Sequence, residues 1–418
     1  QERVARIAGN TYTAGAAARV TAIAIDEGHK PSVPSAILKY NLTEIARAVA
    51  NDTMDVHGGK AIIRGPKNYV ESGYSSVPVA ITVEGANILT RSMITFGQGA
   101  IRCHPFVLPE METAKANDLK GFDKALFGHF GFIFSNMSRA LVLNLTNAAF
   151  TGVPVSGPTK QYYKQLNKYA ASFAICVDIA MSTLGGELKF RELISARLAD
   201  MVSKMYLASM VLKHWADQGS NKEDLPLVQY SIEKLFFEFE EAHEAFLQNL
   251  PARPAAWLLK VLTMPLGRRA KAPNDKLVAK VVDLVSYHTD TRERLIQGAY
   301  RGEKYGAAYE NGLRNPLAVY DSLLDRVEKA EGIYKKIGDA IKAGKYDEAT
   351  LSIEGRINEG VEMGILTADE GEFMIAFEKD VLEMVHVDHF PLEHFGTVAE
   401  NHDKAKKTSK KKSDEATA

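Results

Sequence analysis

A long amphipathic pattern limits the folds open to this chain. Between residues 194 and 215, apolar side chains recur at alternating spacings of four and three: Ile194, Leu198, Met201, Met205, Ala208, Leu212 and Trp215. This spacing places them on one face of a helix, and such a face predicts packing within a bundle. Strand signals are scarce, whereas helical patterns also cover 1–27, 35–57, 84–99, 228–250 and 319–343. We therefore predict an all-α fold, with residues 60–83 as a long loop.

Composition and charge exclude several functional classes. The 418 residues suffice for two to three domains, and the 46% hydrophobic and 25% charged content is that of a globular protein. A formal net charge of −1 creates no overall field that would attract nucleic acid, so we expect no such partner. Cys103 and Cys176 cannot build a disulfide framework, and this favours a reducing, cytoplasmic compartment.

A carboxylate followed by a glycine ends the apolar, β-branched stretch at residues 81–83. Glu84 would lie at a helix N-terminus, partly desolvated by Val83 and Ile88, while Gly85 would leave space for a substrate. That arrangement suits a general base. Acidic residues are also common in first helical turns, because they complement the helix dipole. The segment by itself is compatible with both a base and a helix cap.

Neighbouring motifs have a recognisable spacing. The pair Gly58-Gly59 ends a long helical pattern, Glu84-Gly85 and Arg91 follow, and the string Phe-Gly-Gln-Gly-Ala-Ile-Arg-Cys-His-Pro occupies residues 96–105. Together these segments resemble the C-terminal helical domain of the acyl-CoA dehydrogenases, and most closely the large bacterial-type enzymes that act on medium- and long-chain acyl-CoA. The resemblance covers residues 1–115 with specific motifs and continues as the family's helical C-terminal extension.

The resemblance implies a domain plan. Residues 1–117 would form the family's C-terminal helical domain, 118–400 the bacterial-type extension, and 401–418 a disordered lysine-rich tail. Family members place an N-terminal helical domain and a middle β-domain before this point. Because the sequence opens at Gln1 on a helical pattern, we expect it to be part of a longer protein, with much of the flavin site elsewhere.

The resemblance also implies a reaction. In the intact protein, FAD-dependent oxidation would convert acyl-CoA to trans-2-enoyl-CoA in fatty acid β-oxidation and pass electrons to an electron-transfer flavoprotein, within a homodimer or higher homo-oligomer. Glu84 would remove the α-proton, and Glu84 and Gly85 would contact the substrate. The residues expected to contact FAD are Asp55, Val56, His57, Gly58, Gly59, Ala86, Asn87 and Ile88.

Three positions depart from the family pattern. Asp55 stands where a glutamine is usual and brings a charge near a nucleotide. Ala86 replaces a threonine and removes a hydroxyl donor, and Val83 replaces an aromatic residue. The alternative from another functional class is a non-catalytic helical scaffold that binds lipid or partner helices, in which Glu84 is only a cap.

Residues 251–273 combine an apolar run with basic residues. Trp257, Leu258 and Leu259 precede Arg268 and Arg269, as in a segment that lies at a membrane interface. A buried connector between bundle helices is an equally simple interpretation. We expect peripheral contact with the inner face of the bacterial cytoplasmic membrane through these five residues.

A histidine-rich segment near the end of the chain does not fit a familiar metal site. His386, His389 and His394, with Asp388 among them, lack the usual ligand spacing, and Pro391 interrupts them. We therefore predict no bound metal.

Overall fold

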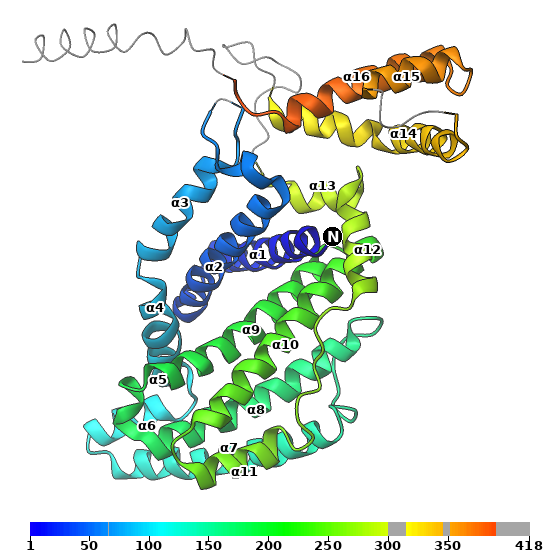
Figure 1. Ribbon diagram of the computed structural model, residues 1–418. Helices are drawn as coiled ribbons and strands as arrows, with labels where there is room; N and C mark the ends of the chain where they lie inside the picture. The colour runs from blue at the N-terminus through cyan, green and yellow to red at the C-terminus, as the bar shows by residue number, and fades with distance from the viewer. Residues whose placement is uncertain (66, 300–314, 346–351, 390–418) are drawn as a thin grey trace, which may run out of the picture. The chain divides into compact units, whose positions relative to one another are not determined.

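The computed structural model describes residues 1–65, 67–299, 315–345 and 352–389, and these residues contain helices and no strand (Figure 1). The predicted all-α class is confirmed. The chain divides into two compact units. One contains residues 1–58 and 72–300, and the other contains residues 59–71 and 301–418. The predicted family boundary at 117/118 remains a prediction.

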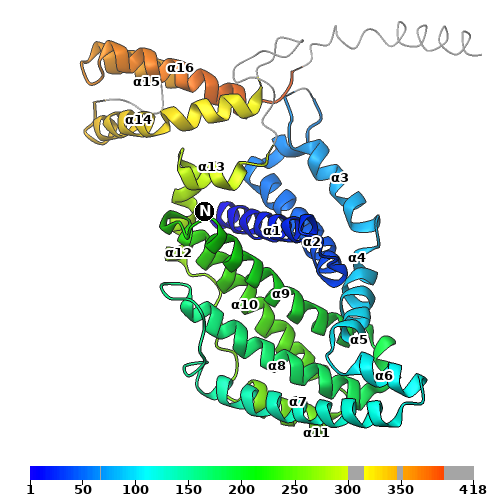
Figure 2. The ribbon, with the colours of Figure 1, turned by 180° about the vertical axis from the view of Figure 1, so that it is seen from behind.

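The first unit carries most of the helices. In chain order they are α1 (Glu2–Asp26), α2 (Ser32–His57), α3 (Glu71–Thr82), α4 (Asn87–Leu89), the π-helical turns η2 (Thr90–Gln98), α5 (Gly99–Cys103), α6 (Val107–Lys115), α7 (Leu119–Leu145), α8 (Lys160–Leu184), η3 (Gly185–Lys189), α9 (Glu192–Asp217), η4 (Lys222–Asp224), α10 (Leu225–Asn249), α11 (Arg253–Thr263), α12 (Asp275–Ser286) and α13 (Asp290–Ile296). Helices α7 to α10 lie side by side, and α1 packs across α9 and α10 (Figure 2).

The core of this unit lies between α8, α9 and α10. The predicted apolar face of residues 194–215 is confirmed, because all its members are buried except Met205, which packs partly buried against them. Small residues let α1 approach closely. A Cβ atom added at Gly9 would lie 2.3 Å from a ring carbon of Tyr230 on α10, so only glycine fits there.

One core helix has the length and composition of a membrane-spanning segment. By these two criteria alone, residues 160–189 would suffice to cross a bilayer. In this structure Ile175 and Cys176, in the middle of α8, are fully buried within the bundle. The hydrophobicity of α8 is therefore explained by its place in the core.

The second unit contains residues 59–62 of the short 3-10 helix η1 (Gly58–Ile62) and the helices α14 (Pro316–Lys342), α15 (Ile353–Glu362) and α16 (Ala368–Val385). Its own apolar core includes Ile333, Ile357, Met374 and Phe377. His394 and the predicted tail at 401–418 lie outside the described residues.

The structure corrects two predictions around the Glu-Gly segment. The predicted loop at 60–83 contains the helix α3, which has no buried residue and therefore lacks the apolar periodicity that reveals a helix in sequence. The helix predicted from residue 84 begins instead at Asn87. Glu84 and Gly85 have φ angles of 54° and 88°, and neither value can continue a right-handed helix.

Candidate active site

Glu84 occupies the bend between α3 and α4. Its backbone has a φ of 54°, in the left-handed region that few non-glycine residues adopt, and its side chain is exposed. Gly85 follows with a φ of 88°, and its carbonyl accepts a hydrogen bond from Thr90 Oγ1 at 3.1 Å. The bend therefore projects the Glu84 side chain outside the helical ladder, where it is free to meet a ligand.

The predicted desolvation of Glu84 is not provided by the described residues. Val83 and Ile88 flank the bend as expected, but both are exposed, and Ile88 retains 77% of its accessible surface. Val79 on α3 and Met93 on η2 are exposed as well. An apolar surface of this kind around one carboxylate is typical of a binding site or interface.

Rigid contacts fix the start of the helix that follows Glu84. Asn87 is buried against α2, where its Oδ1 accepts hydrogen bonds from Lys39 Nζ at 2.7 Å and Thr43 Oγ1 at 3.1 Å. Its Nδ2 donates to Glu44 Oε1 at 2.8 Å. The Asn87 amide is therefore used in contacts with α2, and cofactor contact at Asn87 stays a prediction that only its backbone could fulfil.

Arg91 attaches the same segment to α9. Its Nε donates to Asp200 Oδ1 at 2.9 Å, and a second contact joins its Nη2 to Asp200 Oδ2. The guanidinium also lies 5.9 Å from the centroid of the Tyr40 ring. Arg91, the arginine of the Glu-Gly…Arg motif, thus has a structural role here, because it attaches the chain that follows Glu84 to the helical bundle.

The predicted nucleotide segment ends helix α2. Asp55 pairs with Arg3 at 3.2 Å, and His57 Nδ1 lies 2.8 Å from the carbonyl of Thr53. Gly58 has a φ of 64°, and a Cβ atom at Gly58 would meet no atom within 4 Å. A Cβ atom at Gly59 would also find open space, so both glycines offer exposed backbone to a ligand.

The remaining residues predicted for the cofactor are not enclosed by side chains. Val56 and Ile88 are exposed, and Ala86 is partly buried. Their positions leave them accessible for contact with a ligand or another domain.

The basic and apolar segment at 251–273 is only partly exposed. Trp257, on α11, retains 69% of its surface and Leu258 is also exposed, but Leu259 is fully buried in the core. The prediction that Leu259 contacts a membrane is therefore wrong, because successive helical residues point in different directions. Arg268 lies within 3.4 Å of Glu241, and the backbone N–H of Arg269 donates to Glu240 Oε2 at 2.6 Å.

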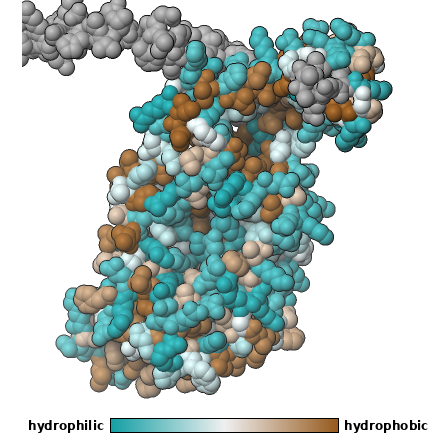
Figure 3. Space-filling view, in the orientation of Figure 1, coloured by the Kyte–Doolittle hydropathy of each residue, from teal (hydrophilic) through white to brown (hydrophobic). Residues whose placement is uncertain are grey.

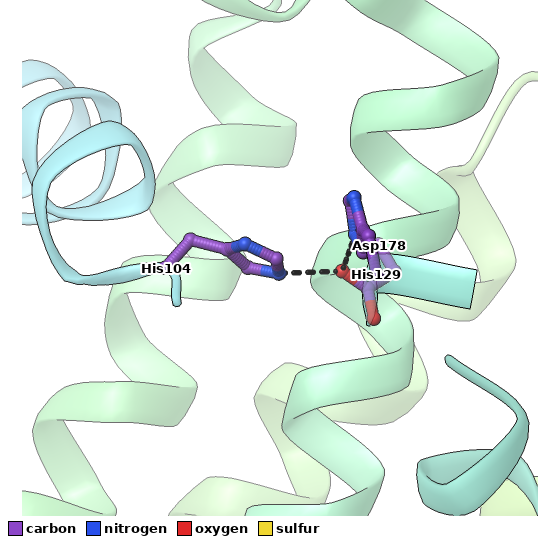
Figure 4. A group of neighbouring side chains, drawn as sticks. All are labelled: His104, His129 and Asp178. Carbon is purple, nitrogen blue, oxygen red and sulfur yellow. Dashed lines mark hydrogen bonds and ion pairs between the residues drawn. The ribbon is translucent and has the colours of Figure 1, made fainter. Parts of the chain in front are cut away.

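The structure also gathers residues that the sequence analysis missed. His104, His129 and Asp178 meet between the α5–α6 connection, α7 and α8, with their ligand atoms within 4.8 Å of one another (Figure 4). Asp178 is 49 positions from His129 and 74 from His104. No local spacing could reveal this group, since its members come from three separate elements.

Comparison with known proteins identifies the family. Residues 101–390 match the family model described as acyl-CoA dehydrogenase, C-terminal, bacterial type, and residues 1–97 match the acyl-CoA dehydrogenase C-terminal domain. A solved structure, an acyl-CoA dehydrogenase complexed with FAD from Bacillus anthracis, aligns with a TM-score of 0.50 and 15% identity. The alignment covers 71% of this chain and 49% of that one, so the chain spans about half the length of this relative, and the likeness concerns the fold. The chain therefore belongs to the acyl-CoA dehydrogenase family and carries its C-terminal domains of the bacterial type.

Proposed function

We propose that the protein containing this chain is an FAD-dependent dehydrogenase that oxidises medium- and long-chain acyl-CoA to trans-2-enoyl-CoA in fatty acid β-oxidation. Glu84 is the base that removes the α-proton. The observation that carries this proposal is the backbone at Glu84. A left-handed conformation at a non-glycine residue costs about 1–3 kcal/mol, and such strain is concentrated at functional sites. Here, the contacts of Asn87 with α2 and of Arg91 with α9 hold the strained backbone at Glu84 in place.

The chemistry needs a fixed carboxylate beside the Cα–H bond. The α-proton of a thioester is weakly acidic, so a base within hydrogen-bonding distance must be held in position as the bond breaks. Glu84 accepts that proton on its carboxylate, and its backbone N–H donates to the thioester oxygen as negative charge develops there. Gly85 adds no side chain of its own beside the carboxylate, and a Cβ atom there would lie 3.1 Å from Thr90 Oγ1. No side chain accepts a hydride, so bound FAD would supply the acceptor for the hydride that leaves Cβ.

The exposed backbone at Gly58 and Gly59 has room for the nucleotide part of a flavin. Gly58 and Gly59 allow a nucleotide to approach the backbone, and the negative charge of nearby Asp55, which departs from the family pattern, is paired with Arg3. We propose that other parts of the full-length protein, or a second copy in a homodimer or higher homo-oligomer, cover the exposed residues around Glu84 and remove water from the carboxylate. Removal from water makes a carboxylate a stronger base. We further propose a cytoplasmic location and an electron-transfer flavoprotein as the electron acceptor.

The test compares the full-length protein with the 418-residue chain. We expect the full-length protein to purify with bound flavin and to reduce an artificial electron acceptor when acyl-CoA is added. The isolated chain should be helical by circular dichroism and free of flavin absorbance. A full-length protein that folds but neither retains flavin nor oxidises acyl-CoA would favour the scaffold alternative. Flavin and activity in the isolated chain would contradict the assignment of the rest of the flavin site to other domains.

A second proposal concerns the exposed faces of α7 and α11. These two helices are in contact, and apolar patches are visible along the edge of the first unit where they lie (Figure 3). We call the exposed apolar residues of these two helices the α7/α11 face, and they include Phe127, Phe130, Phe134, Val142, Leu145, Trp257, Leu258 and Val261. Exposed lysines at 260 and 271 accompany them. We propose that the α7/α11 face binds an anionic bilayer surface peripherally, because insertion of apolar side chains and attraction of basic ones act together.

The membrane proposal predicts a specific effect of Trp257. Co-sedimentation with liposomes should require anionic lipid and weaken as salt rises, since each basic residue near the surface contributes about 1 kcal/mol. Trp257→Glu should reduce the bound fraction without changing the circular dichroism spectrum. Ile25→Glu, at a similarly exposed apolar residue on α1, is the matched control and should leave binding unchanged. Equal binding by wild type and Trp257→Glu would exclude this face as the contact.

A further inference from the structure

A compact group of metal-ligating side chains lies in the first unit, separate from the Glu84 bend in sequence. His104 Nε2 is 2.9 Å from Asp178 Oδ1, and His129 Nε2 is 3.4 Å from the same oxygen (Figure 4). Ligands bound at the usual zinc distances of about 2.0–2.2 Å lie roughly 3 Å apart, so little movement is needed for the three groups to share one ion. Each ligand comes from a different element, and those elements are packed together.

The burial of Asp178 indicates a need for positive charge. Only 1% of its surface is exposed, and within the described residues its Oδ2 atom is buried without a hydrogen-bond partner. A buried carboxylate is costly unless it is paired with a cation or coordinates a metal. Since Oδ1 already faces both histidines, Asp178 offers a charged oxygen to an ion placed between them.

His129 is oriented as metal-binding histidines usually are. Its Nδ1 lies 2.9 Å from Glu110 Oε1 on α6, so the carboxylate accepts the Nδ1 proton. Its Nε2 faces Asp178 Oδ1 at 3.4 Å, so an ion that displaces the proton from this nitrogen would meet its lone pair. A carboxylate behind a histidine fixes both the tautomer and the ring orientation, and removing it usually weakens metal binding by about 10–100-fold.

His104 needs a tautomer change before it can bind an ion. Its Nδ1 accepts the backbone N–H groups of Phe106 and Val107, each at 3.2 Å, so the Nε2 proton is donated to Asp178. Coordination through Nε2 moves the proton to Nδ1 and gives up these two long hydrogen bonds. A metal–imidazole bond outweighs two such contacts. The exchange supplies a spectroscopic marker for binding.

We propose that His104, His129 and Asp178 bind one divalent transition-metal ion of the zinc type, with solvent completing the coordination. Two imidazoles and one carboxylate match Zn²⁺ and similar ions, whereas Mg²⁺ and Ca²⁺ prefer oxygen ligands alone. His104 also lines a cavity of about 200 Å³ whose walls include Phe132 and Val177. Exposed Cys103 lines the same cavity, which therefore gives the ion an access route through an apolar shell.

Zinc binding by the chelator-treated 418-residue chain tests this proposal. Titration calorimetry should show one tight site, and saturating Zn²⁺ should raise the melting temperature, because the ion joins the α5–α6 connection, α7 and α8. Asp178→Asn and His129→Gln should each weaken binding by more than 100-fold, and Glu110→Gln by about 10–100-fold. His29→Gln, at an exposed histidine outside the group, is the matched control and should bind like wild type.

Histidine NMR distinguishes coordination from a purely structural role. In chain labelled with ¹⁵N-histidine, Zn²⁺ should shift one ring from its Nε2–H to its Nδ1–H tautomer, and His104→Gln should abolish that signal. Asp178→Asn removes a buried charge and could fail to fold for that reason alone. In that case, zinc binding by His129→Gln decides whether the proposal holds. Absence of a tight site in wild type, or equally tight binding by a folded His129→Gln chain, would overturn the proposal and leave the group as a metal-free ion-pair network.

Discussion

Replacing Glu84 by glutamine in the full-length enzyme is expected to abolish most of its turnover. Loss of a general base alone lowers rates by about 10²–10⁴-fold, and the neutral amide cannot take the α-proton. Glutamine has nearly the same size and keeps the backbone N–H, so flavin content and acyl-CoA affinity should be retained. Steady-state turnover and acyl-CoA binding, measured on the same preparation, separate the two effects.

The matched control for this variant is Glu192→Gln. Glu192 is an exposed glutamate in the first turn of α9, where it complements the helix dipole and has no assigned catalytic role. Its loss should leave turnover unchanged. Near-normal turnover by Glu84→Gln would reject Glu84 as the base and leave it as a residue of the α3–α4 bend.

The second large effect concerns stability in acid. His243 on α10 is 2% exposed, and its Nε2 lies 2.9 Å from Thr263 Oγ1 and 3.5 Å from Cys176 Sγ. Burial, followed by the positive charge of Lys168, lowers the pKa of His243 from 6.5 to about 3. The folded protein therefore keeps this ring neutral at pH values where the unfolded chain protonates it.

The sign of the effect follows from proton uptake. Between pH 6.5 and pH 3, the unfolded chain binds a proton at His243 that the folded chain does not, so the free energy of unfolding falls as the pH falls. The stability that comes from keeping His243 neutral is fully present above pH 6.5. Below that pH, it falls by about 1.4 kcal/mol per pH unit. This amounts to about 2 kcal/mol at pH 5, a large share of a typical domain stability of roughly 5–15 kcal/mol.

Urea unfolding at pH 7 and pH 5 measures this contribution. The difference in unfolding free energy between the two pH values should be smaller for His243→Gln than for wild type by about 2 kcal/mol. The comparison uses the pH difference, so a general loss of stability in the variant does not affect it. His29→Gln should keep the wild-type difference. An unchanged difference in His243→Gln would mean that another group governs acid unfolding.

The elements that the sequence predicts best are those with a buried apolar face. Residues 194–215 show this, because the face that packs in α9 is the one that the spacing of Ile194 to Trp215 marks. α3 was missed for the opposite reason: it buries no residue and contains Pro78, so its side chains carry no helical periodicity. The π-helical turns at η2, which bury Thr95 and Phe96, were likewise not predicted, because the sequence pattern predicts one regular helix over residues 84–99.

Sequence spacing was less informative about contacts within the site. It selected Glu84 and Gly85 as candidates, but the local pattern could not show that the helix begins at Asn87 or that the bend has a left-handed backbone. The partners of Asn87 lie 43 to 48 positions earlier on α2, so its structural role emerges only when the helices pack. The grouping of His104 with Asp178 has the same origin.

Anaerobic mixing of the full-length protein with acyl-CoA tests the central claim most directly, because it follows a single half-reaction without an external electron acceptor. If Glu84 is the base of an FAD-dependent acyl-CoA dehydrogenase, the visible flavin absorbance of the wild-type protein should bleach rapidly, while Glu84→Gln should bind acyl-CoA and keep its flavin oxidised. Equal bleaching in both proteins would contradict the role of Glu84. Absence of bleaching in a flavin-loaded wild-type protein, across acyl chains of different lengths, would contradict the proposed reaction itself.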